Sequence, residues 1–301
     1  MKNKKTVDVV ICAYNEDENI ERLLKSIISQ KGENFYIKKI IVVSDGSTDS
    51  TVSKVKSFRN SEIELIEYSQ RMGLAARLNE VFLRSKSDVC IKFDGDVILS
   101  SDKVISRLVS GFAKGVGLVA GFRIADNPKS FIEKVHKMGD YIWHSTKRNL
   151  NNGDNVHNHQ GSISAMSHEL VTCLRMPQGL YGTDDFVYVK NREAGLGFVF
   201  AENAFVYFRN PSTFFDYLLQ HRRNLSAKHR LEKYFGDGVL EVYKIPRSYK
   251  MRAIVLGFVK SPAYALCYFA LELFVRLSLV IKPYVSPRFG WELSKTTKSL
   301  V

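Results

Sequence analysis

The sequence contains few cysteines, and they do not form a motif. Its 301 residues include four cysteines, and no two of them stand as Cys-x-x-Cys. Cys12, Cys90 and Cys267 lie within apolar runs, where a free thiol behaves as a small hydrophobic side chain. A disulfide framework and a structural zinc site are therefore not predicted, and we expect a reducing compartment.

The sequence also lacks the glycine-rich loops that bind phosphate. No Gly-x-Gly-x-x-Gly follows the first apolar run, and neither Gly-Lys-Ser nor Gly-Lys-Thr occurs anywhere in the chain. Such loops hold nucleotide phosphates through backbone N–H groups. A nucleotide bound by this chain would therefore need a metal ion to neutralise its phosphates.

Long hydrophobic runs are absent as well. The basic residues near the N-terminus precede an apolar run that extends only from Val7 to Ala13 and contains Asp8, so no signal peptide is expected. No window of 18 uncharged apolar residues exists, which argues against a simple spanning helix. No internal repeat of about 20–50 residues is visible, so a solenoid is not predicted.

The charge balance predicts an anionic partner. Apolar residues make up 45% and charged residues 25% of the chain, as in globular proteins, and the formal net charge is +13. Residues 221–260 contain ten Lys or Arg against three Asp or Glu, so +7 of the excess lies there. Nucleic acid, a phosphorylated substrate and an anionic membrane are the partner classes that this charge allows.

Short β-branched runs alternate with helical patterns along the first hundred residues. Strands are predicted at Val7–Ala13, Ile37–Val43, Ile63–Tyr68 and in the run that leads to Asp94, with helices at Glu18–Gln30, Thr51–Phe58 and Leu74–Ser85. This alternation predicts a parallel sheet with βαβ crossovers. Further along, helices are predicted at Lys103–Ala113, around Phe131–Trp143, from the 181–186 segment to Ala194 and at Phe214–Arg223, with strands at Gly117–Phe122 and within Phe198–Phe208.

Two carboxylates follow the fourth predicted strand. Asp94 and Asp96 flank Gly95, which permits a tight turn and the close approach of a ligand. Alternate residues of an extended chain point the same way, so both carboxylates can reach one small volume. A hard divalent cation that keeps several waters and binds substrate phosphates fits this pair, whereas a solvated acidic turn is the alternative. Other strand ends carry polar residues too, namely Tyr14-Asn15-Glu16 and Asp45, which is typical of α/β ligand sites.

At this point the chain resembles a known family, the family 2 glycosyltransferases with the GT-A fold. The resemblance covers residues 7 to about 225 and rests on four ordered segments at strand–helix junctions. These are Ala13-Tyr14-Asn15-Glu16, Ser44-Asp45-Gly46-Ser47-Thr48-Asp49, Gly73-Leu74-Ala75-Ala76-Arg77-Leu78-Asn79 and Asp94-Gly95-Asp96.

The resemblance implies an α/β fold and a division of the chain. The fold would be GT-A: a Rossmann-like mixed, mainly parallel sheet flanked by helices, with a C-terminal helical hydrophobic extension. Residues 1–210 would form the catalytic domain, with a nucleotide-binding half at 1–100 and an acceptor-binding half at 101–210. Residues 211–301 would form a basic and hydrophobic helical region.

The resemblance also implies an activity, inverting transfer of a hexosyl group from a UDP-sugar or other nucleotide-diphosphate sugar. Tyr14 would stack on the base and Asp45 would hydrogen-bond to it. Asp94 would contact ribose or metal, and Asp96 would bind Mg²⁺ or Mn²⁺. The other implied donor-binding residues are Ala13, Glu16, Gly73, Arg77 and Arg223.

The implied general base lies in the segment Thr183-Asp184-Asp185. It resembles the family's Thr-Glu-Asp motif, with Asp184 in the Glu place and Asp185 in the place of the base; helix capping is the simpler reading. Gln220-His221-Arg222-Arg223-Asn224 resembles a Gln-x-x-Arg-Trp motif of polysaccharide synthases. There Arg223 would grip the diphosphate, while Asn224 in place of Trp argues against a processive enzyme.

His157 and His159 stand two residues apart, as zinc ligands can. No Cys or Glu nearby completes a set, so polar contacts to an acceptor are the preferred interpretation. Arg209 follows the strand predicted within Phe198–Phe208, at a position where many relatives carry a histidine. A metal or phosphate role at that position is therefore left undecided.

Residues 253–285 are the least polar part of the chain and follow the basic segment. This order predicts attachment to the cytoplasmic side of an anionic membrane, peripheral or monotopic, with Phe258, Tyr264, Tyr268, Phe269 and Phe274 entering the lipid. A helical hairpin packed on the catalytic domain, or a contact between copies of the chain, is the alternative.

Three function classes remain at this stage. The preferred one is a glycosyltransferase that uses a nucleotide-sugar donor and a glycan or lipid-linked acceptor and binds no nucleic acid. A sugar-nucleotide pyrophosphorylase would need a basic glycine-rich loop where this chain has the acidic Tyr14-Asn15-Glu16-Asp17. A non-catalytic basic protein that binds nucleic acid or membrane would not need Asp94, Asp96 and Asp185.

Overall fold

The computed structural model describes residues 4–180, 182–282 and 295–297, without the side chains of residues 227–230 and 295. Strands of the described chain form one eight-stranded sheet in the order β3-β2-β1-β4-β7-β6-β8-β5. The strands are β1 (Lys5–Ala13), β2 (Phe35–Asp45), β3 (Ile63–Tyr68), β4 (Val89–Asp94), β5 (Ile98–Leu99), β6 (Val116–Ala125), β7 (Ile163–Ser167) and β8 (Gly197–Phe208).

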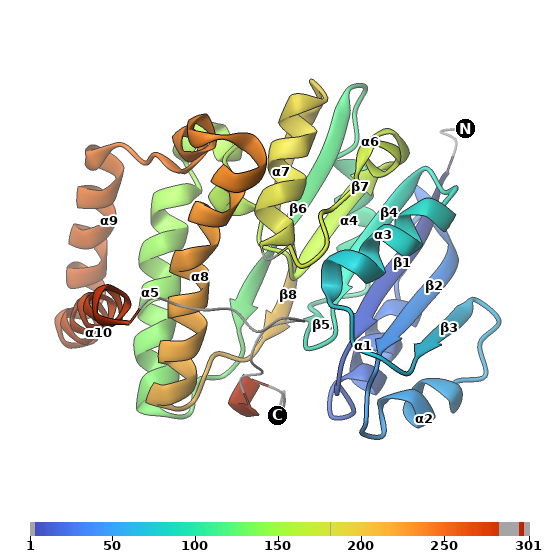
Figure 1. Cartoon of the computed structure of the whole chain (residues 1–301), viewed down its shortest axis with the longest axis horizontal. Coiled ribbons are helices and arrows are strands. Elements are labelled where there is room, and N and C mark those ends of the chain that lie inside the picture. The colour runs from blue at the N-terminus through green and yellow to red at the C-terminus, as the bar shows by residue number, and fades with distance from the viewer. Residues whose placement is uncertain (1–3, 181, 283–294, 298–301) are drawn as a thin grey trace.

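The sheet is mixed and mainly parallel, as the sequence predicts. β1 pairs in parallel with β2 and β4, β2 with β3, and β6 with β8. The antiparallel partners are β7, between β4 and β6, and the short β5 beside β8. The carboxyl ends of β1, β2 and β4 therefore meet at one edge, where parallel sheets bind ligands (Figure 1).

Helices cover both faces of the sheet. One apolar core contains residues of α1 (Ile20–Ile28), α2 (Thr51–Lys56) and α4 (Val104–Ser110), and a second core contains residues of α3 (Leu74–Arg84), α6 (His168–Cys173) and α7 (Thr183–Glu193). Side chains of β1 illustrate the division: Val9 and Ile11 belong to the first core and Val10 to the second. The strict alternation of a strand thus anchors both helix layers.

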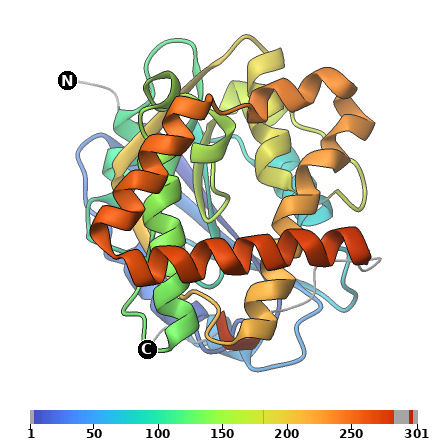
Figure 2. The same ribbon diagram turned by 90° about the vertical axis from the view of Figure 1, so that its left-hand side faces the viewer.

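A third group of helices lies beside the sheet, at the left of Figure 1. It consists of α5 (Phe131–Lys147), α8 (Phe214–Phe235), α9 (Arg247–Lys260) and α10 (Pro262–Ile281). α5 begins with a capping box in which Ser130 and Glu133 exchange hydrogen bonds. Figure 2 shows α10 running across α5 and α8 as the outermost element on this side. Short 3-10 helices are η1 (Leu150–Gly153), η2 (Val156–Asn158), η3 (Asp237–Tyr243) and η4 (Lys295–Thr297).

Two glycines allow α9 and α10 to pack closely on α5. A Cβ on Gly139 of α5 would lie 2.3 Å from the Tyr268 ring of α10, and a Cβ on Gly257 of α9 would lie 2.7 Å from Ile142 of α5. Both distances are too short for an alanine to fit without displacement. The contact is completed by the indole N–H of Trp143, which donates to the Tyr268 hydroxyl at 2.7 Å.

Most predicted elements are found within a few residues, and β3 has the predicted bounds. α8 is the main difference, because it continues from Arg223 to Phe235. The added turns bury Leu231 in the core beneath α7, and the helix ends only at Gly236, whose φ of 74° is left-handed. Phe198–Phe208 forms one strand rather than two, with an irregular register against β6 near Ala120 and Phe122.

The structure bears on two expectations about the C-terminal region, and the one that concerns Tyr268 is wrong. α10 is long and apolar enough to cross a membrane by length and composition, because Glu272 and Arg276 are too few to offset the apolar residues around them. Little of this helix is buried within the protein. Tyr268 does not face outward as predicted but is buried against α5, with Tyr264 and Phe269 packed beside it. Residues 283–285 of the predicted apolar stretch lie outside the described residues.

Candidate functional site

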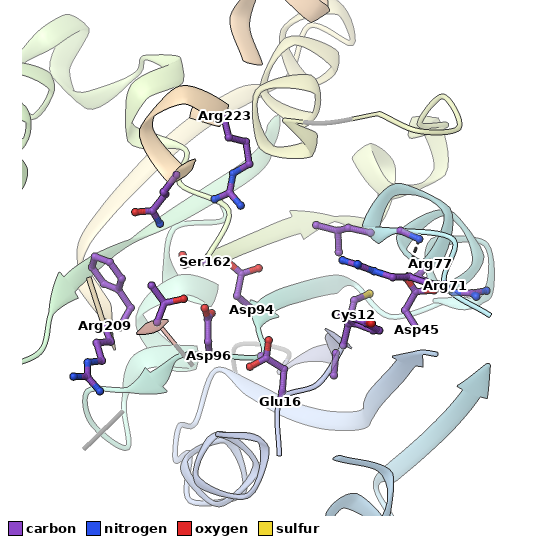
Figure 3. Close-up of a pocket in the computed structure, with 18 of the residues that line it drawn as sticks. Cys12, Glu16, Asp45, Arg71, Arg77, Asp94, Asp96, Ser162, Arg209 and Arg223 are labelled. Atoms are coloured by element: carbon purple, nitrogen blue, oxygen red, sulfur yellow. Dashed lines mark hydrogen bonds and ion pairs between the residues drawn. The ribbon is translucent and has the colours of Figure 1, made fainter. Parts of the chain in front are cut away.

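A cavity of about 170 Å³ lies at the carboxyl ends of β1, β2 and β4. We call it the donor cavity. It is lined by every residue that the sequence assigned to donor or metal binding. These are Ala13, Tyr14, Glu16, Asp45, Gly73, Arg77, Asp94, Asp96 and Arg223. Figure 3 shows Asp94 and Asp96 on one side of this space and Asp45 on the other, with Glu16 and Cys12 between them and Arg223 extending toward Asp94.

The loops that follow β1 and β2 are held together by side-chain hydrogen bonds. The Asn15 amide oxygen accepts from the Thr48 N–H at 2.8 Å, and the Glu16 N–H donates to Thr51 at 2.8 Å. Asn15 has a φ of 53°, a left-handed conformation that asparagine tolerates better than most residues. These contacts fix where Tyr14 and Glu16 stand at the cavity wall.

Asp45, at the end of β2, is buried, and its carboxylate accepts three hydrogen bonds from the protein. Its carboxylate accepts from Arg77 Nε at 2.7 Å and from the backbone N–H groups of Met72 and Gly73 at 2.9 and 2.8 Å. Arg77 is itself buried and donates to the Gln70 carbonyl at 2.8 Å. A carboxylate has about four lone-pair sites, so Asp45 keeps about one for a ligand. Its main role in this geometry is to hold the 70–73 loop.

Aromatic rings and arginines alternate along the same wall. The Arg71 guanidinium lies over the Tyr14 ring with its carbon 3.9 Å from the ring centroid, and Arg77 lies 3.4 Å over Tyr68. Flat stacked groups of this kind present a surface on which a planar base can lie. The Tyr68 hydroxyl also donates to Glu80, which binds Arg77.

A buried lysine neutralises one of the two carboxylates after β4. Lys92 Nζ lies 2.5 Å from Asp94 Oδ1 and also donates to the Gly161 carbonyl. Burial lowers the pKa of Lys92, but the carboxylates of Asp94 and Asp184 outweigh burial and hold it above its ordinary value. Lys92 is therefore a fixed positive charge under the donor cavity.

Asp96 forms no ion pair within the described part of the chain, although the charges of Lys92 and Arg123 act to lower its pKa. Burial, followed by the negative charge of Asp94, raises the pKa of Asp96 to about 6. The Glu16 side chain lies close by, since a Cβ on Gly95 would stand 2.7 Å from Glu16 Cγ. Among the described residues no cluster of three or more His, Cys, Asp or Glu could enclose a metal ion. An incomplete oxygen site with one uncompensated carboxylate fits Mg²⁺ or Mn²⁺ that takes its other ligands from water and phosphate.

Two arginines from the second half of the chain, Arg223 and Arg209, also line the donor cavity. Arg223 projects from α8 toward Asp94 (Figure 3). Arg209 follows β8 and donates from Nε to Glu133 at 3.0 Å. This ion pair connects the cavity wall to the first turn of α5, which gives Arg209 a structural contact at the position left undecided by the sequence.

The two adjacent acids predicted for catalysis point in different directions. The Asp184 carboxylate lies against Gly161, where a Cβ would come within 2.0 Å of it, on the side of Lys92. Asp185 accepts a hydrogen bond from the Tyr243 hydroxyl at 2.6 Å and faces a second cavity instead. Burial and the charge of Asp184 raise the pKa of Asp185 to about 7, although the Tyr243 hydrogen bond acts in the opposite direction. Neither acid lines the donor cavity.

The second cavity has a volume of about 440 Å³ and lies between α5, α8, η3, α9 and α10. It shares Arg123 with the donor cavity, so the two spaces adjoin at that side chain. The predicted polar residues His157 and Gln160 line it. His157 contacts the Tyr243 carbonyl at 3.2 Å, whereas His159 contacts the Asp184 carbonyl at 2.7 Å, so the two histidines do not converge.

Sequence reasoning did not identify several residues of these cavities. They are Lys92, Arg71, Arg123, Lys147 and Tyr243. For Lys92 a signal exists, because a lysine flanked by Ile91 and Phe93 within a buried strand needs an anionic partner. Tyr243 and Lys147 lie far from Asp185 in the chain, and no local sequence pattern predicts that the three residues line one cavity.

Comparisons with known proteins agree with this geometry. The model of the family "Glycosyl transferase family 2" matches residues 8–175. An uncharacterized glycosyltransferase of Haemophilus influenzae is 37% identical over 81 residues, which are 26% of this chain and 24% of that protein. Poly-beta-1,6-N-acetyl-D-glucosamine synthase of Staphylococcus epidermidis is 25% identical over 132 residues, 43% of this chain and 31% of the synthase. The chain thus spans about a quarter to a third of the length of these curated relatives.

Solved structures show the same fold. The mannosyltransferase PcManGT from Pyrobaculum calidifontis, in complex with GDP-Man and Mn²⁺, has a TM-score of 0.60 at 16% identity, covering 94% of this chain and 77% of its own. Glucosyl-3-phosphoglycerate synthase from Mycobacterium tuberculosis, in complex with Mn²⁺, UDP and phosphoglyceric acid, has a TM-score of 0.52 at 22% identity, covering 74% and 78%. The fold is therefore GT-A, with an apolar helix added at the C-terminal side.

The Asp45–Arg77 pair yields a stability prediction. Replacing Arg77 by methionine keeps most of the apolar stem but leaves a buried carboxylate without its charged partner, which typically costs about 3–5 kcal/mol. We expect Arg77→Met to lower the free energy of unfolding by about that amount in urea denaturation. The control is Lys39→Met, which breaks the half-exposed Lys39–Glu64 pair and should cost less than about 1 kcal/mol. Equal losses for the two variants would contradict the assignment.

Proposed function

The chain belongs to glycosyl transferase family 2, and on that premise we propose that it transfers a hexosyl group from a nucleotide-diphosphate sugar, UDP-linked, to a hydroxyl of a glycan or lipid-linked acceptor. One observation carries the proposal. A cavity with two carboxylates at the strand ends adjoins, at Arg123, a second cavity that contains an acid with a raised pKa. Donor and acceptor would meet where the two cavities adjoin.

In this proposal the donor cavity binds the nucleotide. The base lies on the Tyr14 ring, and the remaining lone pair of Asp45 hydrogen-bonds to its edge. Ala13, Glu16, Gly73 and Arg77 complete the wall on that side. Arg223, on the opposite side, grips the diphosphate through its planar fork of donors.

Asp94 and Asp96 would hold Mg²⁺ or Mn²⁺. The raised pKa of Asp96 supports this assignment, because it marks a carboxylate that needs a positive neighbour. When bound, such an ion would neutralise charge on the departing diphosphate, which is Lewis-acid assistance to the leaving group. Lys92 supplies a second positive charge beneath Asp94 and keeps that carboxylate in place.

The proposed chemistry is a single displacement with inversion. The acceptor hydroxyl attacks the anomeric carbon, the bond from that carbon to the phosphate oxygen breaks, and the electron pair leaves with the nucleoside diphosphate. Asp185 accepts the hydroxyl proton, and a base whose pKa is about 7 has a suitable strength near neutral pH. Asp184 takes the place of the Glu in the family motif. Its carboxylate lies on the other side of the same helix turn, against Gly161 and near Lys92.

We also propose that the C-terminal region attaches the protein to the cytoplasmic side of a membrane. Exposed side chains of α10 support this, since Val280 and Ile281 are 82% and 85% exposed. The basic segment before α9 would add attraction of about 1 kcal/mol for each Lys or Arg near an anionic surface.

The metal assignment predicts the behaviour of Asp96→Asn. A folded-state pKa above the ordinary value means that ionised Asp96 destabilises the fold as pH rises through about 6. We therefore expect Asp96→Asn to keep or raise the melting temperature at pH 7 without metal. It should lose the further stabilisation that UDP and Mn²⁺ together give the wild type, and it should lose UDP release from UDP-sugars. Asp102→Asn, at an exposed site, is the control. Wild-type turnover that persists in EDTA would contradict the assignment.

The base assignment predicts a shift in the pH dependence. The acidic limb of kcat/KM should report a pKa near 7 in the wild type, because the free enzyme's base determines it. Tyr243→Phe removes a hydrogen bond that favours ionised Asp185, so the limb should move to higher pH. Asp185→Asn should keep donor affinity and lose about 10²–10⁴-fold in turnover. If Asp184→Asn is the inactive variant and Asp185→Asn is active, the two roles are exchanged.

Membrane attachment predicts that the protein co-sediments with anionic vesicles more than with neutral ones, and less in high salt, because salt screens surface charges over about 8 Å. The variant Val280→Asp with Ile281→Asp should lose most of this binding. Leu83→Asp, which changes an exposed residue of α3, should not. Deleting α9 and α10 is a poorer test because it would uncover α5. If the wild type and both variants fail to co-sediment with either neutral or anionic vesicles, a packed hairpin is favoured instead.

A further inference from the structure

A buried lysine in the second cavity has no anionic partner. Lys147, the last residue of α5, is 5% exposed, and no carboxylate of the described chain lies within ion-pair distance of it. Its carbonyl accepts from the side-chain amides of Asn155 and Asn158 at 2.9 and 3.1 Å, so its backbone is held in place. Burial, and then the charge of Arg123, lowers the pKa of Lys147 to about 7. An anion beside Lys147 would favour its charged form and raise this pKa again.

Each acid that lines this cavity already accepts a hydrogen bond, and Asp185 accepts one from Tyr243. Glu272 accepts from His221 at 2.6 Å and from Tyr217 at 3.1 Å, and Asp140 accepts from Asn210 at 3.0 Å. The basic residues Arg123, Lys147, Lys250 and Arg276 line the same space, and of these only Arg276 has a carboxylate of the described residues within 4.0 Å. The cavity therefore favours a negatively charged ligand.

The second cavity continues into an apolar groove. Trp143, Lys250, Glu272 and Arg276 line both spaces. Beyond them, the groove of about 340 Å³ runs between α5, α9 and α10 and is lined mainly by apolar side chains. These include Ile142, Ile254, Phe269 and Leu273. Two lysine or arginine side chains thus stand where the charged cavity meets the apolar groove.

We propose that the acceptor is an amphiphile in which a phosphate links the acceptor sugar to an apolar chain, with the phosphate at Lys147, Lys250 and Arg276 and the chain in the α5–α9–α10 groove. The placement of features carries the assignment: Asp185 and Lys147 line the second cavity, Lys250 and Arg276 line its junction with the groove, and the apolar groove follows. Val280 and Ile281, further along α10, are apolar and exposed, so a lipid chain longer than the groove would extend over them.

This inference rests on the proposed function for the position of the acceptor hydroxyl, but binding of the phosphate and chain is measured separately. The probes are farnesyl phosphate, farnesol and inorganic phosphate, titrated calorimetrically into the full-length protein. Farnesyl phosphate should bind, and the two probes that lack either the charge or the chain should bind at least tenfold more weakly. Inorganic phosphate that binds as tightly as farnesyl phosphate would overturn the apolar chain, and equally tight farnesol would overturn the phosphate site.

Two pairs of matched variants locate the ligand. Lys147→Met should weaken farnesyl phosphate at least tenfold and leave farnesol unchanged, whereas Lys137→Met, an exposed lysine of the same helix, should change neither. Leu273→Ser should weaken farnesyl phosphate and Leu277→Ser, also exposed on α10 but outside the groove, should not. Lys147→Met removes an unpaired buried charge, so it should fold at least as stably as the wild type.

The same experiment separates two kinds of failure. If Lys147→Met binds farnesyl phosphate as tightly as the wild type does, this inference is overturned. The proposed function would still stand if UDP binding depends on Asp96. Tight farnesyl phosphate binding with the predicted variant effects, in a protein that releases no UDP from any UDP-sugar, would support the lipid site and overturn the proposed transfer.

Discussion

The buried ion pair between Asp45 and Arg77 is the constraint on which the donor cavity depends. It joins the end of β2 to α3, and the same carboxylate receives the N–H groups of Met72 and Gly73. A buried charge is tolerated only where its partners are in place, so strand end, loop and helix must adopt one arrangement together. The wall that carries Tyr14 and Arg71 is consequently formed before any ligand arrives, which lowers the ordering cost of binding.

Charge at the end of β4 is distributed differently, and this couples the binding of metal and nucleotide. Lys92 offsets Asp94, so the carboxylates of the turn attract a cation less strongly than their number suggests. Burial and the charge of Asp94 still keep the pKa of Asp96 raised, although Lys92 and Arg123 act in the opposite direction. A divalent ion placed there would gain most of its remaining stabilisation from phosphate oxygens. This electrostatic balance favours metal and nucleotide together over either alone.

Sequence reasoning succeeded where function follows from local order along the chain. Strand ends with polar residues were visible as short patterns, and those residues do line one cavity. The different directions of Asp184 and Asp185 were not predicted, although helix geometry accounts for them, since successive residues lie about 100° apart around the axis. Lys92 and Lys147 were missed because burial of a long charged side chain depends on partners that are distant in sequence. The end of α8 was missed because packing of Leu231, rather than a break in the pattern, extends that helix to Gly236.

The two cavities draw on different parts of the chain. All the proposed donor residues except Arg223 lie within residues 8–175, the part that matches the family. The second cavity takes His221 from α8, Tyr243 from η3, Lys250 from α9 and Arg276 from α10, all outside that match. Close packing at Gly139 and Gly257 holds these helices on α5. Substitutions in the C-terminal helices could therefore change which acceptor fits while the donor cavity stays intact, because the two spaces share little more than Arg123.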